Sequence, residues 1–201
     1  MAHISTANTK LGCIPSVNLP PVETCLCDAP CIAHCYARKG RFRFPSVRKT
    51  LEYNWQEWRN KPVDYMNSVI QACINVRYFR WHSSGDIPSR FYLHMMCVTA
   101  KICPEVRFLC FTKKYELVNS YLETYGSLPE NLCMVFSAWG DFIPENPHNL
   151  PVAYVELSSG EGACHIPDDA IECCGSCFDC IRTDASCWHL NNGQSVKFKQ
   201  H

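Results

Sequence analysis

The middle of the chain alternates between two hydrophobic patterns. Apolar residues recur at helical spacing in several segments, for example at Met66, Val69, Ile70 and Cys73. Short and nearly continuous apolar runs, such as 106–112, lie between these segments and are typical of parallel strands buried on both faces. The pattern predicts strands at 76–82, 106–112, 132–138 and 152–157, a last short strand at 195–198, and helices at 46–60 with Ser46 as the N-cap, from 62 onward, at 88–102 and at 115–125.

This alternation of strand and helix predicts the α/β class, with a parallel sheet and crossover helices. A partial barrel and an open doubly wound sheet both fit the order of the elements, but the segment between the two cysteine clusters is too short for a complete eight-fold barrel. We therefore predict an incomplete TIM-like barrel in a single domain over residues 1–201. Residues 1–40 form the N-terminal arm and first cysteine cluster, 41–157 the α/β core, and 158–201 a loop-rich, cysteine-rich segment.

The composition bears on the compartment and on the partners. The 201 residues have a formal net charge of zero, so the chain has no bulk field for nucleic acid or acidic lipid. No apolar run approaches the roughly 20 residues that a membrane helix needs, and the N-terminus has no apolar signal segment. We therefore expect a cytoplasmic protein. Disulfides are rare in that compartment, so the 16 cysteines indicate metal ligation.

The strongest sign of metal ligation lies near the C-terminus. Cys174, Cys177 and Cys180 form a C-x2-C-x2-C sequence, which brings three thiolates to one side of a tight loop. This spacing begins the ligand run of bacterial ferredoxins, whereas zinc sites more often use two separated C-x2-C pairs, so iron–sulfur is favoured over zinc. The fourth ligand stays open among Cys164, Cys173 and Cys187.

A second group of cysteines lies in a short, Pro-broken segment near the N-terminus. Two overlapping sets of three thiolates are available there, one with Cys25 and one with Cys27, each combined with Cys31 and Cys35. The set with Cys27 has one residue more than the C-x3-C-x2-C spacing of radical S-adenosylmethionine enzymes. Three thiolates around a four-iron cluster leave one iron open to substrate or cofactor. His34 is a further potential ligand, but a lone histidine beside cysteines more often lies next to the ligands or on the surface.

Several stretches of the chain resemble the phage gene-product-88 family. They are Leu19-Pro20, Thr24-Cys25, Cys31, Cys35-Tyr36-Ala37, Gly40, Arg80-Trp81-His82-Ser83-Ser84-Gly85-Asp86, Cys187-Trp188, and Val196-Lys197-Phe198-Lys199 with His201. They touch both ends and the middle, so the resemblance covers most of the chain. It implies phage association and a cysteine-rich iron–sulfur protein with a barrel-like core. The chain departs from the family by carrying Cys27 and by separating Cys180 from Cys187, so the ligand set stays open.

The strand end at 82–86 is the main motif without cysteine. Parallel sheets bind ligands at the carboxyl ends of their strands. In radical S-adenosylmethionine enzymes a Gly-Gly-Glu-Pro turn there holds the amino group of the cofactor, and Ser84-Gly85-Asp86 followed by Pro88 is similar to it. The hypothesis gives His82 and Asp86 catalytic roles, and Ser84 and Gly85 cofactor-binding roles. The alternative makes Asp86 a turn residue or helix cap, which is the interpretation we favour for Asp141.

Two further patterns have simpler explanations. Residues 38–44, Arg-Lys-Gly-Arg-Phe-Arg-Phe, precede Arg48 and Lys49 and are able to contact phosphates, but a solvated face is favoured because the chain as a whole is neutral. Single cysteines spread over the apolar elements are expected to be small core residues. These are Cys73, Cys97, Cys103, Cys110 and Cys133.

The leading hypothesis is a phage-associated iron–sulfur protein with redox or radical chemistry at an open iron. It expects one or two [4Fe-4S] clusters, S-adenosylmethionine as a further cofactor, and a small-molecule ligand or redox partner. The runner-up is a zinc- or cluster-stapled structural or nucleic-acid-binding module without catalysis. The candidate metal ligands are Cys25, Cys31, Cys35, Cys164, Cys174, Cys177, Cys180 and Cys187.

Overall fold

The structure, a computed structural model, describes residues 1–157, 165–183 and 186–199. Its strands are β1 (Ile4–Ser5), β2 (Ser16–Val17), β3 (Tyr78–Trp81), β4 (Arg107–Thr112), β5 (Leu132–Ser137), β6 (Val152–Glu156), β7 (Ile171–Glu172) and β8 (Ser195–Lys199). Its helices are α1 (Pro45–Asn60), α2 (Pro62–Ala72), α3 (Arg90–Ile102), α4 (Tyr115–Tyr125) and the single turn α5 (Cys177–Cys180). Three 3-10 turns precede α1: η1 (Pro30–Ile32), η2 (Tyr36–Arg38) and η3 (Gly40–Arg43).

The described strands form one sheet in the order β1-β2-β3-β4-β5-β6-β8-β7. Strands β2 to β6 follow one another in chain order, and each neighbouring pair among them is parallel. Strand β8 pairs parallel with both β6 and β7, whereas β1 pairs antiparallel with β2. The predicted α/β class and largely parallel sheet are confirmed. The sheet is not closed, because β1 and β7 form two separate edges.

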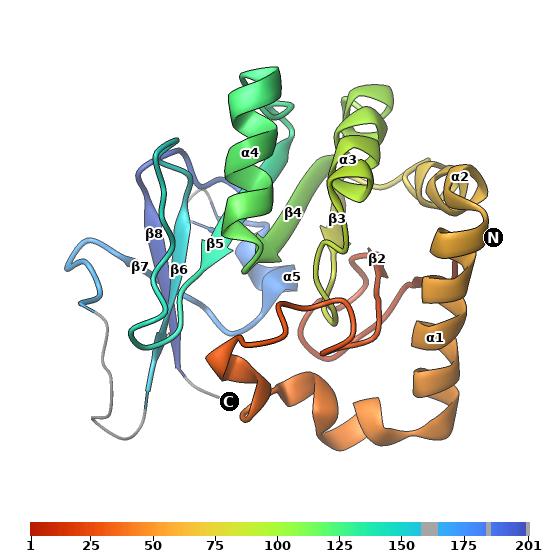
Figure 1. Cartoon of the computed structure of the whole chain (residues 1–201), viewed down its shortest axis with the longest axis horizontal. Helices are drawn as coiled ribbons and strands as arrows, with labels where there is room; N and C mark the ends of the chain where they lie inside the picture. The colour runs from red at the N-terminus through yellow and green to blue at the C-terminus, as the bar shows by residue number, and fades with distance from the viewer. Residues whose placement is uncertain (158–164, 184–185, 200–201) are drawn as a thin grey trace.

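The two faces of the sheet are covered by different parts of the chain. On one face Phe108 of β4 joins the core beneath the helices, and Figure 1 shows α3 and α4 lying across β3 and β4. On the other face Leu109 and Val135 pack with Leu11 and Trp188, which come from the two ends of the chain. Burial on both faces explains why β4 and β5 read as nearly continuous apolar runs. Cys180, Cys187 and Trp188 of the C-terminal segment are therefore part of the core on this second face.

Helix boundaries follow local chemistry that differs slightly from the prediction. Helix α1 begins at Pro45 with Phe44 at the N-cap, so the prediction that Ser46 caps this helix is wrong. Proline suits the first helical position because its fixed φ matches the helix and its missing N–H would have no partner there. Helix α3 begins after Ser89, whose Oγ accepts a hydrogen bond from the Tyr92 backbone N–H at 3.1 Å.

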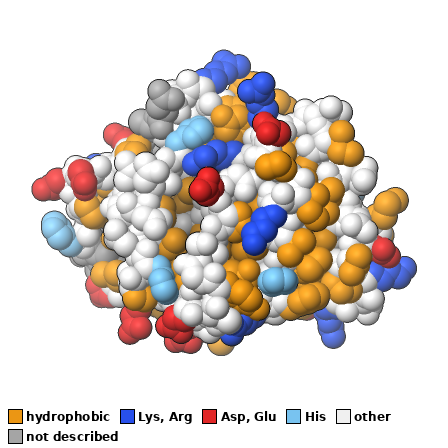
Figure 2. All heavy atoms as spheres, turned by 90° about the horizontal axis from the view of Figure 1, so that it is seen from above, with side chains coloured by type: hydrophobic (Ala, Val, Ile, Leu, Met, Phe, Trp, Pro, Cys, Tyr) orange, Lys and Arg blue, Asp and Glu red, His pale blue; other side chains and the backbone are white. Residues whose placement is uncertain are grey.

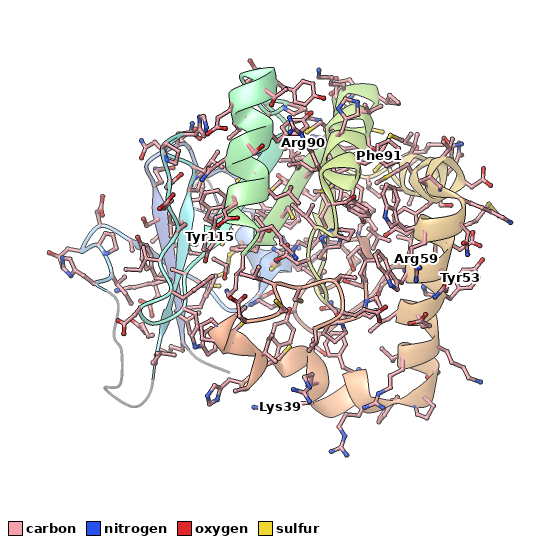
Figure 3. The ribbon with its side chains drawn as sticks, viewed as in Figure 1. Lys39, Tyr53, Arg59, Arg90, Phe91 and Tyr115 are labelled. Carbon is pink, nitrogen blue, oxygen red and sulfur yellow. A yellow bond between two sulfur atoms is a disulfide. The ribbon has the colours of Figure 1, made fainter. Side chains whose placement is uncertain are left out.

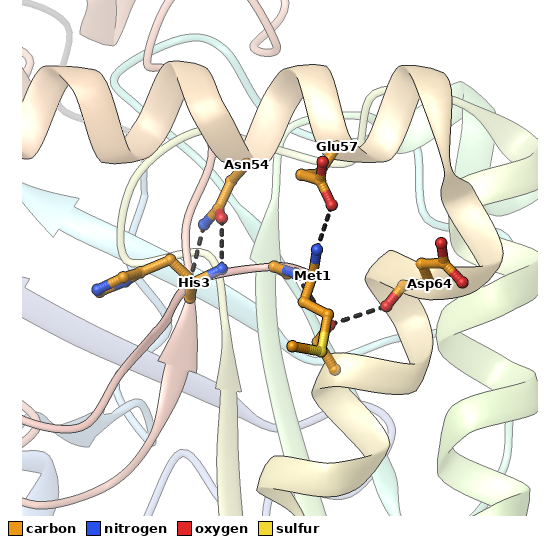
Figure 4. Close-up of polar contacts among 7 residues, drawn as sticks. Met1, His3, Asn54, Glu57 and Asp64 are labelled. Atoms are coloured by element: carbon orange, nitrogen blue, oxygen red, sulfur yellow. Dashed lines mark hydrogen bonds and ion pairs between the residues drawn. The ribbon is translucent and has the colours of Figure 1, made fainter.

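The N-terminal residues are fastened to α1 by a buried asparagine (Figure 4). Asn54, which is 1% exposed, accepts the backbone N–H of His3 on Oδ1 at 2.7 Å. Its Nδ2 donates to the carbonyls of His3 and Asn18, both at 3.0 Å. One side chain thus holds the residue before β1 and the residue after β2 against the helix. The N-terminal arm of the sequence prediction is an ordered edge of the fold.

Asn54→Ala should lower the free energy of unfolding by roughly 2–3 kcal/mol, because it leaves one N–H and two carbonyls without their partner in a buried site. Asn60→Ala, at the exposed end of the same helix, should change it by less than about 0.5 kcal/mol. Urea denaturation of both variants measures the difference. Equal stability of the two variants would show that the arm is not held by Asn54.

The amino ends of the strands carry an apolar surface. Figure 2 looks onto this end of the molecule, and hydrophobic side chains gather there on the side of α2 and α3. A groove of about 520 Å³ lies among them, bordered by the C-terminal ends of both helices. Ile74 and Ile102 are more than half exposed there.

In the described part of the chain no helix combines the length and the apolar character needed to cross a membrane.

Candidate functional site

The turn that follows β3 holds the segment that leads into the first cysteines. Ser84 exchanges two hydrogen bonds with Leu19: its carbonyl accepts the Leu19 N–H, and its Oγ donates to the Leu19 carbonyl, both at 3.0 Å. The Asp86 N–H donates to Thr24 Oγ1 at 3.1 Å. Gly85 has φ +80°, and a Cβ at that position would lie 2.6 Å from Thr24 Oγ1 and 2.8 Å from the Leu19 carbonyl. Glycine therefore permits the close approach of residues 19–24 to the strand end.

Asp86 ties the ends of two strands together. Its carboxylate is buried, and Oδ1 accepts from Thr112 Oγ1 at 2.6 Å and from the Ile87 N–H at 2.7 Å. Oδ2 accepts the N–H of Lys113, the residue after β4, at 2.9 Å. Burial raises the pKa of Asp86, and these three hydrogen bonds oppose the rise. Both oxygens are thus engaged by the chain itself, which gives Asp86 a positioning role between β3 and β4.

His82 faces the aromatic core and not an open cleft. Its Nε2 lies 2.9 Å from the Tyr92 hydroxyl, which in turn lies 3.0 Å from the Tyr65 hydroxyl. The residue is 3% exposed and has φ +54°. Burial, assisted by the Arg80 charge, lowers the pKa of His82 to about 3, so the imidazole is neutral near pH 7. The structure therefore places this predicted catalytic residue in a buried hydrogen-bonded chain beneath α3.

His82 should make the protein sensitive to acid. Because its folded-state pKa lies below the unfolded value near 6.5, the unfolded chain binds the extra proton, and stability falls as the pH drops from about 6 toward 3. The His82 contribution should approach about 1.4 kcal/mol per pH unit between about pH 6 and 4. We expect His82→Asn, which tolerates a positive φ, to remove this part of the slope in urea denaturation. His94→Asn, on α3, is the matched control and should keep it.

Three N-terminal cysteines lie on the segment that is fastened to these strand ends. Burial first, and then the nearby Asp86 carboxylate, raises the pKa of the Cys25 thiol to about 11, with smaller contributions from Cys35 and Cys31. Burial also raises the pKa of Cys31, on which Cys35 and Asp86 act in the same direction. The three thiols are therefore close enough to influence one another. Cys27 is exposed, and its Sγ lies 3.9 Å from Asp28 Oδ1, outside this group. Cys25, Cys31 and Cys35 are thus partly buried, whereas Cys27 is exposed.

Two lysines complete the surroundings of these thiols. Lys113 Nζ donates to the carbonyl and Oγ of Ser137, at 3.0 and 2.6 Å. Burial lowers the pKa of Lys113, whereas its attraction to Cys31 and Asp86 raises it. Lys114 Nζ donates to the Cys25 carbonyl at 3.1 Å, and so fastens the cysteine segment to the start of α4. Lys113 directly follows a buried parallel strand, which is the signal by which the sequence could have revealed it.

His34 and Tyr36 seat the same segment on the strand ends. The His34 ring stacks on Trp139 with centroids 6.1 Å apart, so His34 lies against the turn that follows β5. The Tyr36 hydroxyl donates to the carbonyl of Ser83. Asp141 is exposed in the turn after Trp139. In Figure 3 Tyr115 of α4 lies beside this region, where its hydroxyl donates to the Ser137 carbonyl.

The C-terminal cysteines form a second group on the face of the sheet opposite α3 and α4. Cys187 is buried, and its pKa is raised, first by its hydrogen bond with Cys173, then by burial, and to a smaller extent by Cys177. Cys173 and Cys177 pack against the same apolar core. The structure joins Cys174 and Cys180 in a disulfide, although the sequence predicts three free thiolates in C-x2-C-x2-C and a compartment in which disulfides are rare. The candidate ligand Cys164 lies outside the described residues.

Neither group is arranged as a preformed single-ion site. Among residues 1–157, 165–183 and 186–199, no three or more His, Cys, Asp or Glu side chains are grouped so that they could hold one metal ion. A tetrahedral zinc ion needs its sulfur ligands within about 4 Å of one another, since each Zn–S bond is about 2.3 Å. A four-iron cluster is larger and spreads its thiolates farther apart. The N-terminal group offers three thiols and, close to Cys31, the ammonium group of Lys113.

The chain matches a known family over most of its length. The sequence model of the family described as gene product 88 matches residues 2–186. The chain belongs to the gene product 88 family. The matched residues include the N-terminal cysteines and the turn after β3, and they end one residue before Cys187. No curated protein and no solved structure matches the chain.

Proposed function

We propose that the protein binds an iron–sulfur cluster through Cys25, Cys31 and Cys35 and uses it in redox or radical chemistry at the carboxyl edge of the sheet. The observation that carries this proposal is that Cys25, Cys31 and Cys35 share one segment, which Lys114 fastens to the start of α4, with Lys113 close enough to act on Cys31. Carboxyl ends of parallel strands are the usual position for ligands in α/β folds. A four-iron cluster held by three thiolates supplies single-electron chemistry and one iron open to a small molecule.

The residues around the thiols have distinct tasks in this proposal. The ammonium group of Lys113 balances thiolate charge, because it is buried and attracted to Cys31. Lys114 holds the backbone of Cys25. Ser84, Gly85 and Asp86 position the cysteine segment through Leu19 and Thr24, so the amino group of S-adenosylmethionine is not assigned to them. His82 has a structural task in this proposal, because it is buried and its Nε2 lies 2.9 Å from the Tyr92 hydroxyl.

The finer fold assignment belongs to the same proposal. Strands β2 to β6 lie side by side in chain order, and α2, α3 and α4 lie between successive strands along the chain. A series of parallel strands joined by helices is the repeating unit of a TIM barrel. We therefore propose an incomplete barrel whose inner face is filled by both ends of the chain, among them Leu11 and Trp188.

A structural role without catalysis is the second candidate. It is favoured by the turn at 82–86, where Ser84 and Asp86 are fully engaged by the chain itself. It is also favoured by the disulfide between Cys174 and Cys180, which staples a segment with little regular structure. In this case the N-terminal cysteines would hold zinc or remain free thiols.

Metal and sulfide analysis of protein purified without oxygen decides between the two. The proposed function expects about four iron atoms and a similar amount of acid-labile sulfide per occupied site. It also expects a broad absorption band near about 400 nm that is bleached by dithionite. About one zinc per chain without sulfide would support the structural role and exclude the proposed cluster.

A further inference from the structure

A basic surface lies beside the cysteine site on the part of the chain that runs from η2 into α1. We define it by six side chains that the structure leaves exposed. They are Arg38, Lys39, Arg41, Arg43, Arg48 and Lys49. No Asp or Glu occurs between Asp28 and Glu52, so the whole segment is uniformly positive in a chain whose net charge is zero. Overall neutrality therefore hides a strong local field.

The charges of this surface are not balanced by ion pairs. In the described part of the chain the ion pairs join the N-terminal ammonium group to Glu57 and Lys197 to Glu156, and neither involves the basic surface. The one intramolecular contact from its cationic groups is Arg38 Nη1 to the Ile32 carbonyl, at 3.5 Å, among the hydrogen bonds of the described residues. In Figure 3 Lys39 lies at the outer edge of the molecule. These groups are therefore available to an external polyanion.

Aromatic rings are interleaved with the charges. Phe44 is 56% exposed and Tyr36 is 51% exposed, although both are large apolar rings. Tyr36 and Phe42 form an edge-on pair with centroids 5.9 Å apart. Burying these rings in the core would have been favourable, so their exposure between arginines indicates a surface for stacking.

The surface also has a concave part. A groove of about 480 Å³ runs between the proline turn at 20–22 and the start of α1. Two cations and one carboxylate line it, together with apolar side chains: Arg38, Arg48, Glu52, Phe42 and Leu51. Figure 1 shows this region below the carboxyl ends of the strands, on the same edge as the cysteine site. A flexible chain of phosphates is able to follow such a groove.

We propose that this surface binds single-stranded nucleic acid, with its arginines and lysines on the phosphates and Phe44 and Tyr36 stacked on bases. Two observations favour a single strand over a duplex. The rings are exposed side by side with the charges, and bases are open to stacking only when they are unpaired. The cations lie on short 3-10 turns and on the first turns of α1, and not along one helix that could enter a major groove. This proposal is independent of the proposed cluster.

Fluorescence anisotropy with labelled single strands of DNA and RNA tests the proposal on the full chain purified without oxygen. We expect binding whose logarithm falls linearly with the logarithm of the salt concentration. Arg41→Ala/Arg43→Ala should weaken binding about tenfold or more at low salt and should reduce the slope by about 1.4, or 0.7 for each lost phosphate contact. Phe44→Ala should also weaken binding about tenfold but leave the salt slope unchanged.

Arg77→Ala/Lys101→Ala is the matched control, because it removes two exposed positive charges from the amino edge of the sheet. It should bind as the unaltered protein does, and all variants should keep the same metal content and circular dichroism. Binding to one or both kinds of single strand that responds as described supports the proposal. Tighter binding to duplex DNA, equal loss in the control variant, or no binding at about 50 mM salt would overturn it.

Discussion

Cys25→Ala is expected to abolish cluster binding, whereas Cys27→Ala, two residues away, should retain it. The Cys25 thiol lies with Cys31 and Cys35 beside Asp86, while the Cys27 thiol is exposed next to Asp28. Removal of one of three thiolates leaves too few ligands to hold a four-iron cluster. Iron and sulfide content after anaerobic purification should fall by at least about tenfold for Cys25→Ala. Cys31→Ala should behave in the same way.

Cys97→Ala provides a second control, because Cys97 is buried in the middle of α3, away from both cysteine groups. It tests whether loss of any buried cysteine reduces cluster content through lower stability. We expect its metal content to equal that of the unaltered protein. If Cys27→Ala lost the cluster and Cys25→Ala retained it, the ligand set would be the one with the spacing closer to that of radical S-adenosylmethionine enzymes, and the proposed geometry would be wrong.

Gly85→Ala is expected to destabilise the protein by about 2–4 kcal/mol and to reduce cluster content with it. A methyl group at this position would lie 2.8 Å from the Leu19 carbonyl and 2.6 Å from Thr24 Oγ1, so the backbone of residues 19–24 must move. Alanine at φ +80° also costs about 1 kcal/mol of backbone strain, and overpacking adds about 1–3 kcal/mol. Urea denaturation measures the stability, and iron analysis measures the displacement of the cysteine segment.

Gly126→Ala separates the two contributions. Gly126 also has φ +80°, but no heavy atom lies within 4 Å of an added Cβ. This variant should therefore lose only about 1 kcal/mol of stability and keep its metal content. A Gly85→Ala protein no less stable than Gly126→Ala would show that residues 19–24 do not pack against the strand end as described.

The local patterns of the sequence were sufficient for the main elements. The apolar runs at 106–112 and 132–138 predict β4 and β5, because a strand covered on both faces must be apolar at nearly every position. The predicted helix at 115–125 coincides with α4, and the predicted helix at 88–102 begins two residues early relative to α3. Such patterns depend on neighbours within one or two turns, so the sequence by itself carries them.

The sequence predicts one part of the cysteine site, and the tertiary structure decides the rest. The sequence alone located the N-terminal cysteines and the turn at 82–86, because both stand out from their surroundings in residue type. It left Cys25 and Cys27 as alternatives, because both spacings are sterically acceptable in an isolated segment. Only the tertiary structure brought Cys25 next to Asp86 and left Cys27 exposed.

The surroundings of the other site residues were decided by contacts between distant parts of the chain. Asp86 lies 26 residues before Thr112 in sequence, but the parallel register of β3 and β4 places their ends side by side. Through that contact Asp86, whose catalytic role stays a prediction, bridges the segments that follow β3 and β4. The basic surface likewise depends on where its charges lie and not on their total. Composition determines net charge and periodicity determines elements, but the convergence of side chains requires the register of the sheet, which no local pattern contains.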